Sequence, residues 1–337
     1  MFDKLMNSYF YGKSGKGDYR KEDLPRTRWQ LFWEMLRVRV AGLMRLNLVY
    51  MLAWLPTIIV LVFGAVSLIY TALPDDQTAD PAAIVEGGEM ASEQIDPAHV
   101  EAWDPVEVAS AIQSVIWLTL LLLVPCIAIT GPFTAGLSYV TRNWARDEHA
   151  FAFSDFWDAV KANWKPSLVV SLITSLMPLV IYLCWTYYGQ LASQNAFMVV
   201  PQTISVMVGL IWSLAVTYTY PMLVTYQMRL RDVLRNSFLL AIGRLPMSVG
   251  IRLLHCVPAL IAFLLAMANL NLLWVILGLA GYYIIAGFGL SRFVTASYTN
   301  GVFDKYINSR IEGAVVDRGL NTEPEDEEDD EDDASEE

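Results

Sequence analysis

Six long apolar runs constrain this chain more than any other feature of its sequence. Each has about 20 or more mostly apolar residues, the length that a helix needs to cross the hydrocarbon core of a bilayer. With 55% hydrophobic and only 17% charged residues, the chain is unlike soluble proteins, in which about a quarter of residues are charged. The sequence therefore predicts an all-α, polytopic membrane protein with six transmembrane helices. The predicted spans are Asn47 to Ala72, Ala111 to Tyr139, Ser167 to Tyr188, Thr203 to Val224, Val249 to Leu270 and Asn271 to Leu290.

The basic residues predict how these spans are oriented. All 23 Lys and Arg residues lie before the first span, between spans two and three, between spans four and five with the start of span five, or after the sixth span. The other three loops hold none. Because bases are retained on the cytoplasmic side of a membrane, we expect both termini in the cytoplasm and the spans in the plasma membrane.

Four parts are expected along the chain. Residues 1–46 form a cytoplasmic basic arm with an interfacial helix, 47–294 the six-span domain with an acidic extracellular insertion at 73–110, 295–321 a cytoplasmic juxtamembrane segment, and 322–337 an acidic tail. The tail carries 12 carboxylates and no base, which accounts for the whole net charge of −12. A block of like charges repels itself and buries no apolar surface, so the tail is expected to be disordered.

Three stretches that precede the odd-numbered spans resemble one another. They are WQLFWEMLRVRVAGLMRLN from Trp29, FSDFWDAVKANWK from Phe153 and VLRNSFLLAIGRLPMS from Val233. Each places apolar residues at helical spacing beside a few charges, which is typical of a helix that lies in the membrane interface. The sequence therefore predicts three units, each an interfacial amphipathic helix followed by a two-span hairpin. The alternative is that the three stretches are alike by chance, since any six-span protein can show basic amphipathic flanks.

The expected interfacial anchors are aromatic and basic. Tryptophan favours headgroup depth, and long basic side chains reach the headgroups from helix ends. Arg252, near the start of the fifth span, is expected to snorkel in this way. His255, about one turn later, is interpreted as an interfacial side chain bonded to a carbonyl or headgroup, with a pore or proton role as the alternative. The full set is Trp29, Trp33, Arg37, Arg39, Arg45, Arg252 and His255.

The predicted spans lack the groups that catalysis or ion transport requires. No Asp, Glu, Lys or Arg falls in the hydrocarbon part of a span, whereas ion-coupled transporters place such groups there. The three cysteines form no CxxC pair, and no Walker, HExxH or GxSxG motif is present. The dense polar cluster from Arg146 to His149 consists of consecutive residues, which do not converge on one point. We therefore expect no enzyme, no cofactor, no metal site and no nucleic-acid partner.

A candidate seam for helix packing or partner binding starts at the end of the second span. The stretch GPFTAGLSYVTRNW from Gly131 is rich in small residues and hydroxyls, which let helices approach closely and bond to one another. A groove for a lipid or a partner helix is the alternative interpretation. The candidate residues are Gly131, Pro132, Thr134, Ala135, Gly136, Arg142, Arg146, Phe153, Asp155, Phe156 and Trp164.

The stretch GPFTAGLSYVTRNWARDEHAFAFSDFWDAVKANWKPSL, from Gly131 to Leu168, resembles the signature of YesL-like bacterial membrane proteins. A Gly-Pro pair, an Ala-rich span end, a basic loop and an F-x-D-F aromatic helix occur in the same order. The opening MFDKLMNSYF and the later DVLRNSFLLAI are also similar to that family, whereas the outer loop and the acidic tail depart from it. The resemblance implies a protein of a Gram-positive plasma membrane; the family is uncharacterised, and its members often accompany carbohydrate uptake systems.

Two functions are consistent with these observations. The first is a non-enzymatic accessory protein that binds a membrane transporter complex, or itself, from within the lipid bilayer; an ABC-type carbohydrate uptake system is the partner that the resemblance implies. The alternative is a transporter or channel for a neutral or lipid-like solute. Prolines within the spans favour this alternative, because they break helices and free backbone carbonyls to line a cavity.

Overall fold

The computed structural model describes residues 25–72, 105–268 and 271–321, and these residues are almost entirely helical. The basic arm, most of the outer loop and the acidic tail therefore lie outside the described residues. The helices are α2 (Arg28–Ala72), α3 (Pro105–Trp144), α4 (Ser154–Ala192), α5 (Val199–Thr225), α6 (Leu230–Gly243), α7 (Leu245–Met267), α8 (Leu272–Tyr282) and α9 (Phe288–Tyr306). A π-helical segment, Tyr283–Gly287, joins α8 to α9.

Within the described ranges, six helical stretches are long and apolar enough to cross a membrane. They are α2, α3, α4, α5 with the short 3-10 turn before it, α7, and the continuous stretch from α8 through α9. This confirms the predicted all-helical chain with six candidate spans.

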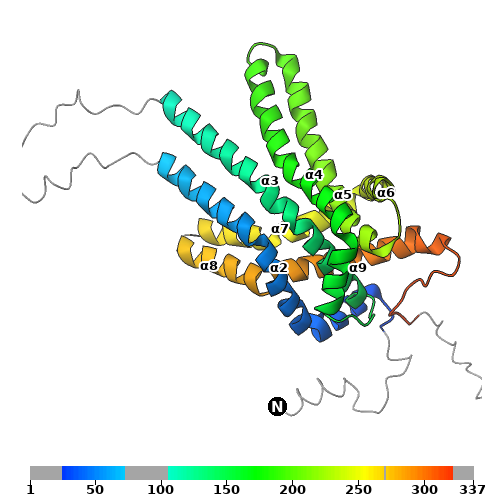
Figure 1. Ribbon diagram of the computed structural model, residues 1–337. Helices are drawn as coiled ribbons and strands as arrows, with labels where there is room; N and C mark the ends of the chain where they lie inside the picture. The colour runs from blue at the N-terminus through cyan, green and yellow to red at the C-terminus, as the bar shows by residue number, and fades with distance from the viewer. Residues whose placement is uncertain (1–24, 73–104, 269–270, 322–337) are drawn as a thin grey trace, which may run out of the picture.

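Figure 1 shows three helical hairpins that diverge from a shared base. Helix α2 pairs with α3, α4 pairs with α5, and α7 pairs with α8. The base contains the start of α2, the end of α3, the start of α4, α6 and most of α9. Because the helices alternate in direction, the Lys and Arg residues of the described chain gather at this base, which we call the basic end.

Burial is concentrated at the basic end. One buried cluster joins α2, α3, α4 and α9, and the other joins α3, α4, α5, α6 and α9. The far halves of the hairpins present exposed apolar side chains, as along α7, where Ser248 is the one buried residue. Lipid tails are as apolar as leucine, so these exposed surfaces suit contact with a bilayer.

The first two interfacial helices are not separate from the spans that follow them, which corrects the prediction. Helix α2 continues from Arg28 through the first span, and α4 continues from Ser154 through the third. No proline interrupts residues 29–46, and Gly42 is their only glycine. The 45 residues of α2 extend about 68 Å at 1.5 Å per residue, far more than the roughly 30 Å hydrocarbon core. Only the third unit has a break, at Arg244 between α6 and α7.

The last span extends further than its hydropathy predicted. Helix α9 continues past Leu290 to Tyr306, so part of the expected juxtamembrane segment is helical and continues the last candidate span. Polar residues such as Thr299 and Asn300 lower the hydropathy there, but both are buried. At the other end of the outer loop, α3 begins at Pro105 rather than after Ser110.

We expect the basic end to face the cytoplasm, because bases are retained on that side. In a variant whose native cysteines are replaced by serine, Ser193→Cys lies in the exposed turn between α4 and α5, and Lys161→Cys lies exposed near the basic end. A membrane-impermeant maleimide added to intact cells should label S193C and leave K161C unlabelled until the cells are opened. The reverse pattern would contradict the orientation.

Candidate functional site

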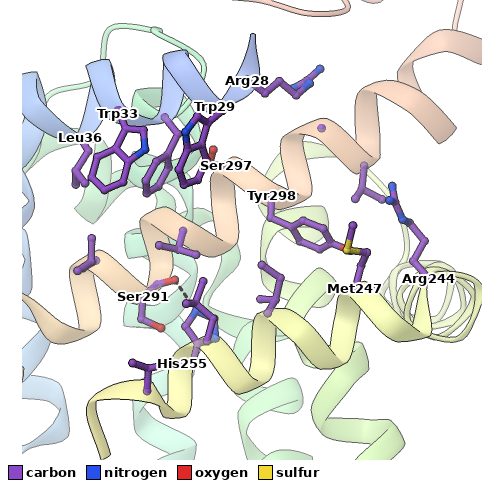
Figure 2. A pocket seen from close by; sticks show the side chains of 18 of the residues that line it. Arg28, Trp29, Trp33, Leu36, Arg244, Met247, His255, Ser291, Ser297 and Tyr298 are labelled. Atoms are coloured by element: carbon purple, nitrogen blue, oxygen red, sulfur yellow. Dashed lines mark hydrogen bonds between the residues drawn. The ribbon is translucent and has the colours of Figure 1, made fainter. Parts of the chain in front are cut away.

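A groove of about 1570 Å³ lies at the basic end, lined by α2, α7, the π-helical segment and α9. In Figure 2, α9 runs between α2 and α7, so it forms the floor of the groove and the other two helices form its walls. The lining is mainly apolar and aromatic. The volume exceeds the roughly 300–1,000 Å³ of pockets that hold drug-sized molecules, so the groove has room for a larger ligand.

The wall formed by α2 is aromatic. Trp29 and Trp33 are 68% and 51% exposed, and their ring centroids lie 5.5 Å apart in an edge-to-face arrangement. Phe32 completes the wall and also packs on Phe293 of α9, with 5.5 Å between ring centroids. The two tryptophans, predicted as interfacial anchors, therefore line the groove. Sequence reasoning missed the groove because its walls are more than 200 residues apart.

One end of the groove is charged. It is lined by Arg28, Arg244, Asp304, Lys305 and Asp317. Arg28 forms ion pairs with both carboxylates, at 2.8 Å from Nη2 to Asp304 Oδ2 and at a shorter contact with Asp317. Among the described residues, neither Arg244 nor Lys305 has an ion-pair partner; each lies instead against the ring of Tyr306, at 5.5 and 5.7 Å from its centroid.

His255 of α7 lies along the groove toward its apolar end. Its Nε2 lies 3.1 Å from the carbonyl oxygen of Ser291 and 3.3 Å from Thr295 Oγ1, both on α9 (Figure 2). With the carbonyl as acceptor, the imidazole donates and joins a wall of the groove to its floor. Within the described part of the chain, no group of three or more His, Cys, Asp or Glu side chains is arranged to hold a metal ion.

The π-helical segment forms part of the apolar end, and Asn47 of α2 stabilises it. The Asn47 side chain is fully buried. It donates from Nδ2 to the carbonyl oxygens of Tyr283 and Ile284, at 2.9 and 2.7 Å, and accepts the N–H of Gly289 at 2.8 Å. In hydrocarbon, each unsatisfied backbone group costs several kcal/mol, and a wide turn leaves such groups without helical partners. The sequence signal was a lone Asn at the start of an apolar run.

The small residues of the predicted seam lie where α3 packs closely on α4. A Cβ atom on Gly131 would lie 2.4 Å from the carbonyl oxygen of Ser167, and one on Gly136 would lie 2.8 Å from that of Phe156. Ala135 and Phe156 are fully buried. Only glycine permits this backbone approach at the two positions.

The other seam residues do not converge with the glycines. Thr134 hydrogen-bonds Tyr50 of α2 at 2.7 Å, and Asp155 accepts the N–H of Phe151 at 2.9 Å at the start of α4. Pro132 is half-buried, Phe153 and Trp164 are exposed, and Arg142 and Arg146 belong to the polar network described next.

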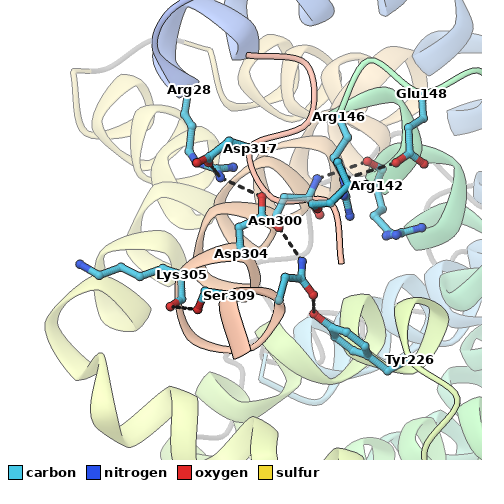
Figure 3. A network of polar contacts seen from close by, with 12 residues as sticks. Arg28, Arg142, Arg146, Glu148, Tyr226, Asn300, Asp304, Lys305, Ser309 and Asp317 are labelled. Atoms are coloured by element: carbon cyan, nitrogen blue, oxygen red, sulfur yellow. Dashed lines mark hydrogen bonds and ion pairs between the residues drawn. The ribbon is translucent and has the colours of Figure 1, made fainter. Parts of the chain in front are cut away.

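A polar network at the basic end ties the segment after α9 to the helices (Figure 3). Asp304 accepts hydrogen bonds from Arg28 and from Asn308 Nδ2, at 2.8 and 2.5 Å. The Tyr226 hydroxyl donates to Asn308 Oδ1 at 2.7 Å. Burial raises the pKa of Tyr226 to about 12, helped by the charge of Asp304, so the phenol keeps the proton that it donates.

A second part of the network lies beside the end of α3. Arg146 Nε and Arg318 Nη1 lie 3.4 and 3.3 Å from the same oxygen of Glu148. Asn300 of α9 donates to the carbonyl of Arg142 at 3.2 Å. Arg146 and Glu148 thus bind the segment after α9, through the carbonyl of Val315 and through Arg318.

The remaining predicted anchors separate into two groups. Arg37 and Arg45 are exposed, and Arg39 lies over the ring of Trp144 with 6.0 Å from Cζ to its centroid. Arg252 makes a contact with α5. Its guanidinium donates to the carbonyl of Ser213 in α5, because α7 begins at Leu245 and places Arg252 two turns inside the helix.

Together these features define a polytopic helical membrane protein with an apolar groove that is charged at one end. Residues 111–185, most of α3 and α4, match a family described as "Protein of unknown function, DUF624". The match confirms the predicted resemblance to YesL-like proteins. The seam lies within the matched residues, whereas the groove residues lie outside them.

Two uncharacterized proteins of Bacillus subtilis (strain 168) are distant homologues of the chain. YesV is 27% identical over 142 residues, which cover 42% of this chain and 67% of YesV. YesL is 28% identical over 114 residues, which cover 34% of this chain and 52% of YesL. The matched part of the chain thus spans about half the length of YesL. No solved structure matches the chain.

The close approach of the α3 and α4 backbones at the seam allows a quantitative prediction. Gly131→Ala forces a methyl group against the backbone of α4, and it should destabilise the protein by about 1–3 kcal/mol, as overpacking does. Thermal unfolding in detergent measures the change, and the loss of the monodisperse peak reports the unfolding. Gly250→Ala on α7 is the matched control, since nothing lies within 4 Å of its Cβ position. Equal midpoints for both variants would disprove the close packing.

Proposed function

We propose that the protein is a non-enzymatic membrane protein that binds an amphipathic, lipid-like molecule in the groove. The observation that carries this proposal is the polarity of the groove, which is charged at one end and lined by apolar and aromatic side chains elsewhere. A ligand with a polar head and a long apolar body matches that gradient. A sugar or another fully polar solute would leave its hydroxyls without partners along the apolar lining.

The length of the groove supports a ligand from one leaflet of the bilayer. Along α7 the lining extends from Arg244 to Pro258, which is about 21 Å of helix at 1.5 Å per residue. Half of the roughly 30 Å hydrocarbon core is about 15 Å. The groove therefore reaches from headgroup depth to near the middle of the membrane.

The walls of the groove leave it accessible from the side. Trp29 and Trp33 on one wall and Met247 and Leu254 on the other are all exposed. A molecule dissolved in the bilayer can therefore enter laterally, without crossing water. Release to the opposite leaflet would make the protein a transporter, and retention would make it a lipid-dependent scaffold.

Filling the groove should displace the ligand. Ser297 lies on the floor, between the two walls (Figure 2), and Ser297→Trp adds an indole there. We expect native mass spectrometry of protein extracted in mild detergent to show retained lipid in the wild type and most of it lost in S297W. Thr203→Trp, at an exposed position on α5, should retain lipid like the wild type. Equal retention in all three proteins would exclude the groove as the binding site.

A second proposed function is docking on another membrane protein. An exposed aromatic face at the start of α4 favours it, formed by Phe153, which directly precedes the helix, and by Trp157 and Trp164. Lys161 and Lys165 are exposed on the same part of the helix. The resemblance to YesL-like proteins supplies an ABC-type carbohydrate uptake system as the proposed partner, with a second copy of this chain as the other candidate.

The docking proposal is tested by recovery from native membranes. Tagged protein extracted in mild detergent from cells grown on different sugars should bring down permease subunits, and Trp157→Ala with Trp164→Ala should reduce their recovery several-fold. Leu176→Ala, also exposed but farther along α4, serves as the control. If the wild type yields only the single chain on every sugar, the docking proposal fails.

A further inference from the structure

We infer that the groove selects an anionic phospholipid, whose phosphate group binds between Arg244 and Lys305. This inference rests on the proposed binding function and adds the chemical class of the ligand. It follows from the distribution of charge at the polar end of the groove.

The cations at this end have unequal surroundings. Arg28 forms ion pairs with two carboxylates, those of Asp304 and Asp317, so its charge is neutralised within the protein. Arg244 and Lys305 have no carboxylate partner among the described residues. The lining of the groove therefore carries three cations and two anions, and the excess positive charge resides on Arg244 and Lys305.

These two cations come from different elements and meet at one ring. Arg244 stands at the break between α6 and α7, and Lys305 lies in the last turn of α9. Both charged groups lie within 6 Å of the centroid of the Tyr306 ring. An anion that lies beside this ring is attracted by both cations. A phosphate offers several acceptor oxygens to a guanidinium and an ammonium at once.

A smaller cavity beside the groove provides room for the rest of a headgroup. It has a volume of about 350 Å³, and Arg244 lines both cavities. Asn236 and Arg310 also line the smaller cavity, which brings a further donor and a third cation to the site. These cations would repel a headgroup that carries its own ammonium, whereas they would not repel glycerol or another uncharged headgroup.

The structure thus assigns the acyl chains to the aromatic and apolar part of the groove and the phosphate to its basic mouth. Zwitterionic lipids carry the same phosphate together with an ammonium, so the preference depends on the absence of a positive charge in the headgroup. A basic residue near a membrane surface contributes a roughly fivefold preference for anionic lipid. We therefore expect enrichment of anionic over zwitterionic lipid in the groove.

The test uses the full chain reconstituted in vesicles with equal amounts of phosphatidylglycerol and phosphatidylcholine. After extraction in mild detergent, native mass spectrometry measures the ratio of the two lipids that remain bound. The wild type should be enriched in phosphatidylglycerol, and Arg244→Gln with Lys305→Gln should reduce the enrichment roughly fivefold or more while total bound lipid stays the same. Arg231→Gln, exposed on α6, should leave the ratio unchanged.

The other outcomes separate the inference from the proposed function. A wild-type ratio equal to that of the vesicle would overturn the anionic selection, while lipid loss in S297W would still support the groove. If R231Q lowers the ratio as much as the double variant does, the anionic selection is also overturned, because surface charge alone then explains the preference. Inorganic phosphate added in excess should leave the bound lipid in place; if it lowers the enrichment while total lipid persists, the site takes a free phosphate and the assignment to a lipid headgroup is wrong.

Discussion

The contact between Asn47 and the backbone of the last membrane helix is the interaction on which the groove depends. A membrane helix satisfies its own N–H and C=O groups, and a π-helical turn interrupts that pattern. Asn47 supplies two donors and one acceptor to the interrupted backbone. Because Asn47 belongs to α2, the same contact fixes α2 against the floor of the groove. Phe288 adds to it, stacked on Trp54 with 5.3 Å between ring centroids.

The rest of the basic end is arranged around this contact. The seam between α3 and α4 brings two backbones together through Gly131 and Gly136, and this pair packs against α2. The polar network then joins α9 and the segment after it to the ends of α2 and α3 through Asp304 and Glu148. The hairpins diverge beyond this base (Figure 1), so the groove is held by a packed base and opens toward the apolar region.

The fold was largely predictable from the sequence, and the candidate site was not. The six spans follow from apolar runs that are too long for most soluble helices, and the small residues around Gly131 indicated a close helix contact. The continuity of α2 was missed because its basic residues suggested a separate interfacial helix. The groove was missed because it joins Trp29 and Trp33 to helices near the other end of the chain. Asn47 seemed to mark a span boundary, and only the fold shows that it is buried against Tyr283.

The most direct test of this account is hydrogen exchange of the amides from Tyr283 to Gly289 in lipid nanodiscs. Asn47→Leu removes the three hydrogen bonds, so we predict faster exchange in this segment and loss of lipid from the groove. Asn163→Leu is the matched control, since the Asn163 side chain donates to a carbonyl of its own helix, that of Ala159 at 3.0 Å. Unchanged exchange in N47L, with the same bound lipid as the wild type, would contradict the central role of Asn47.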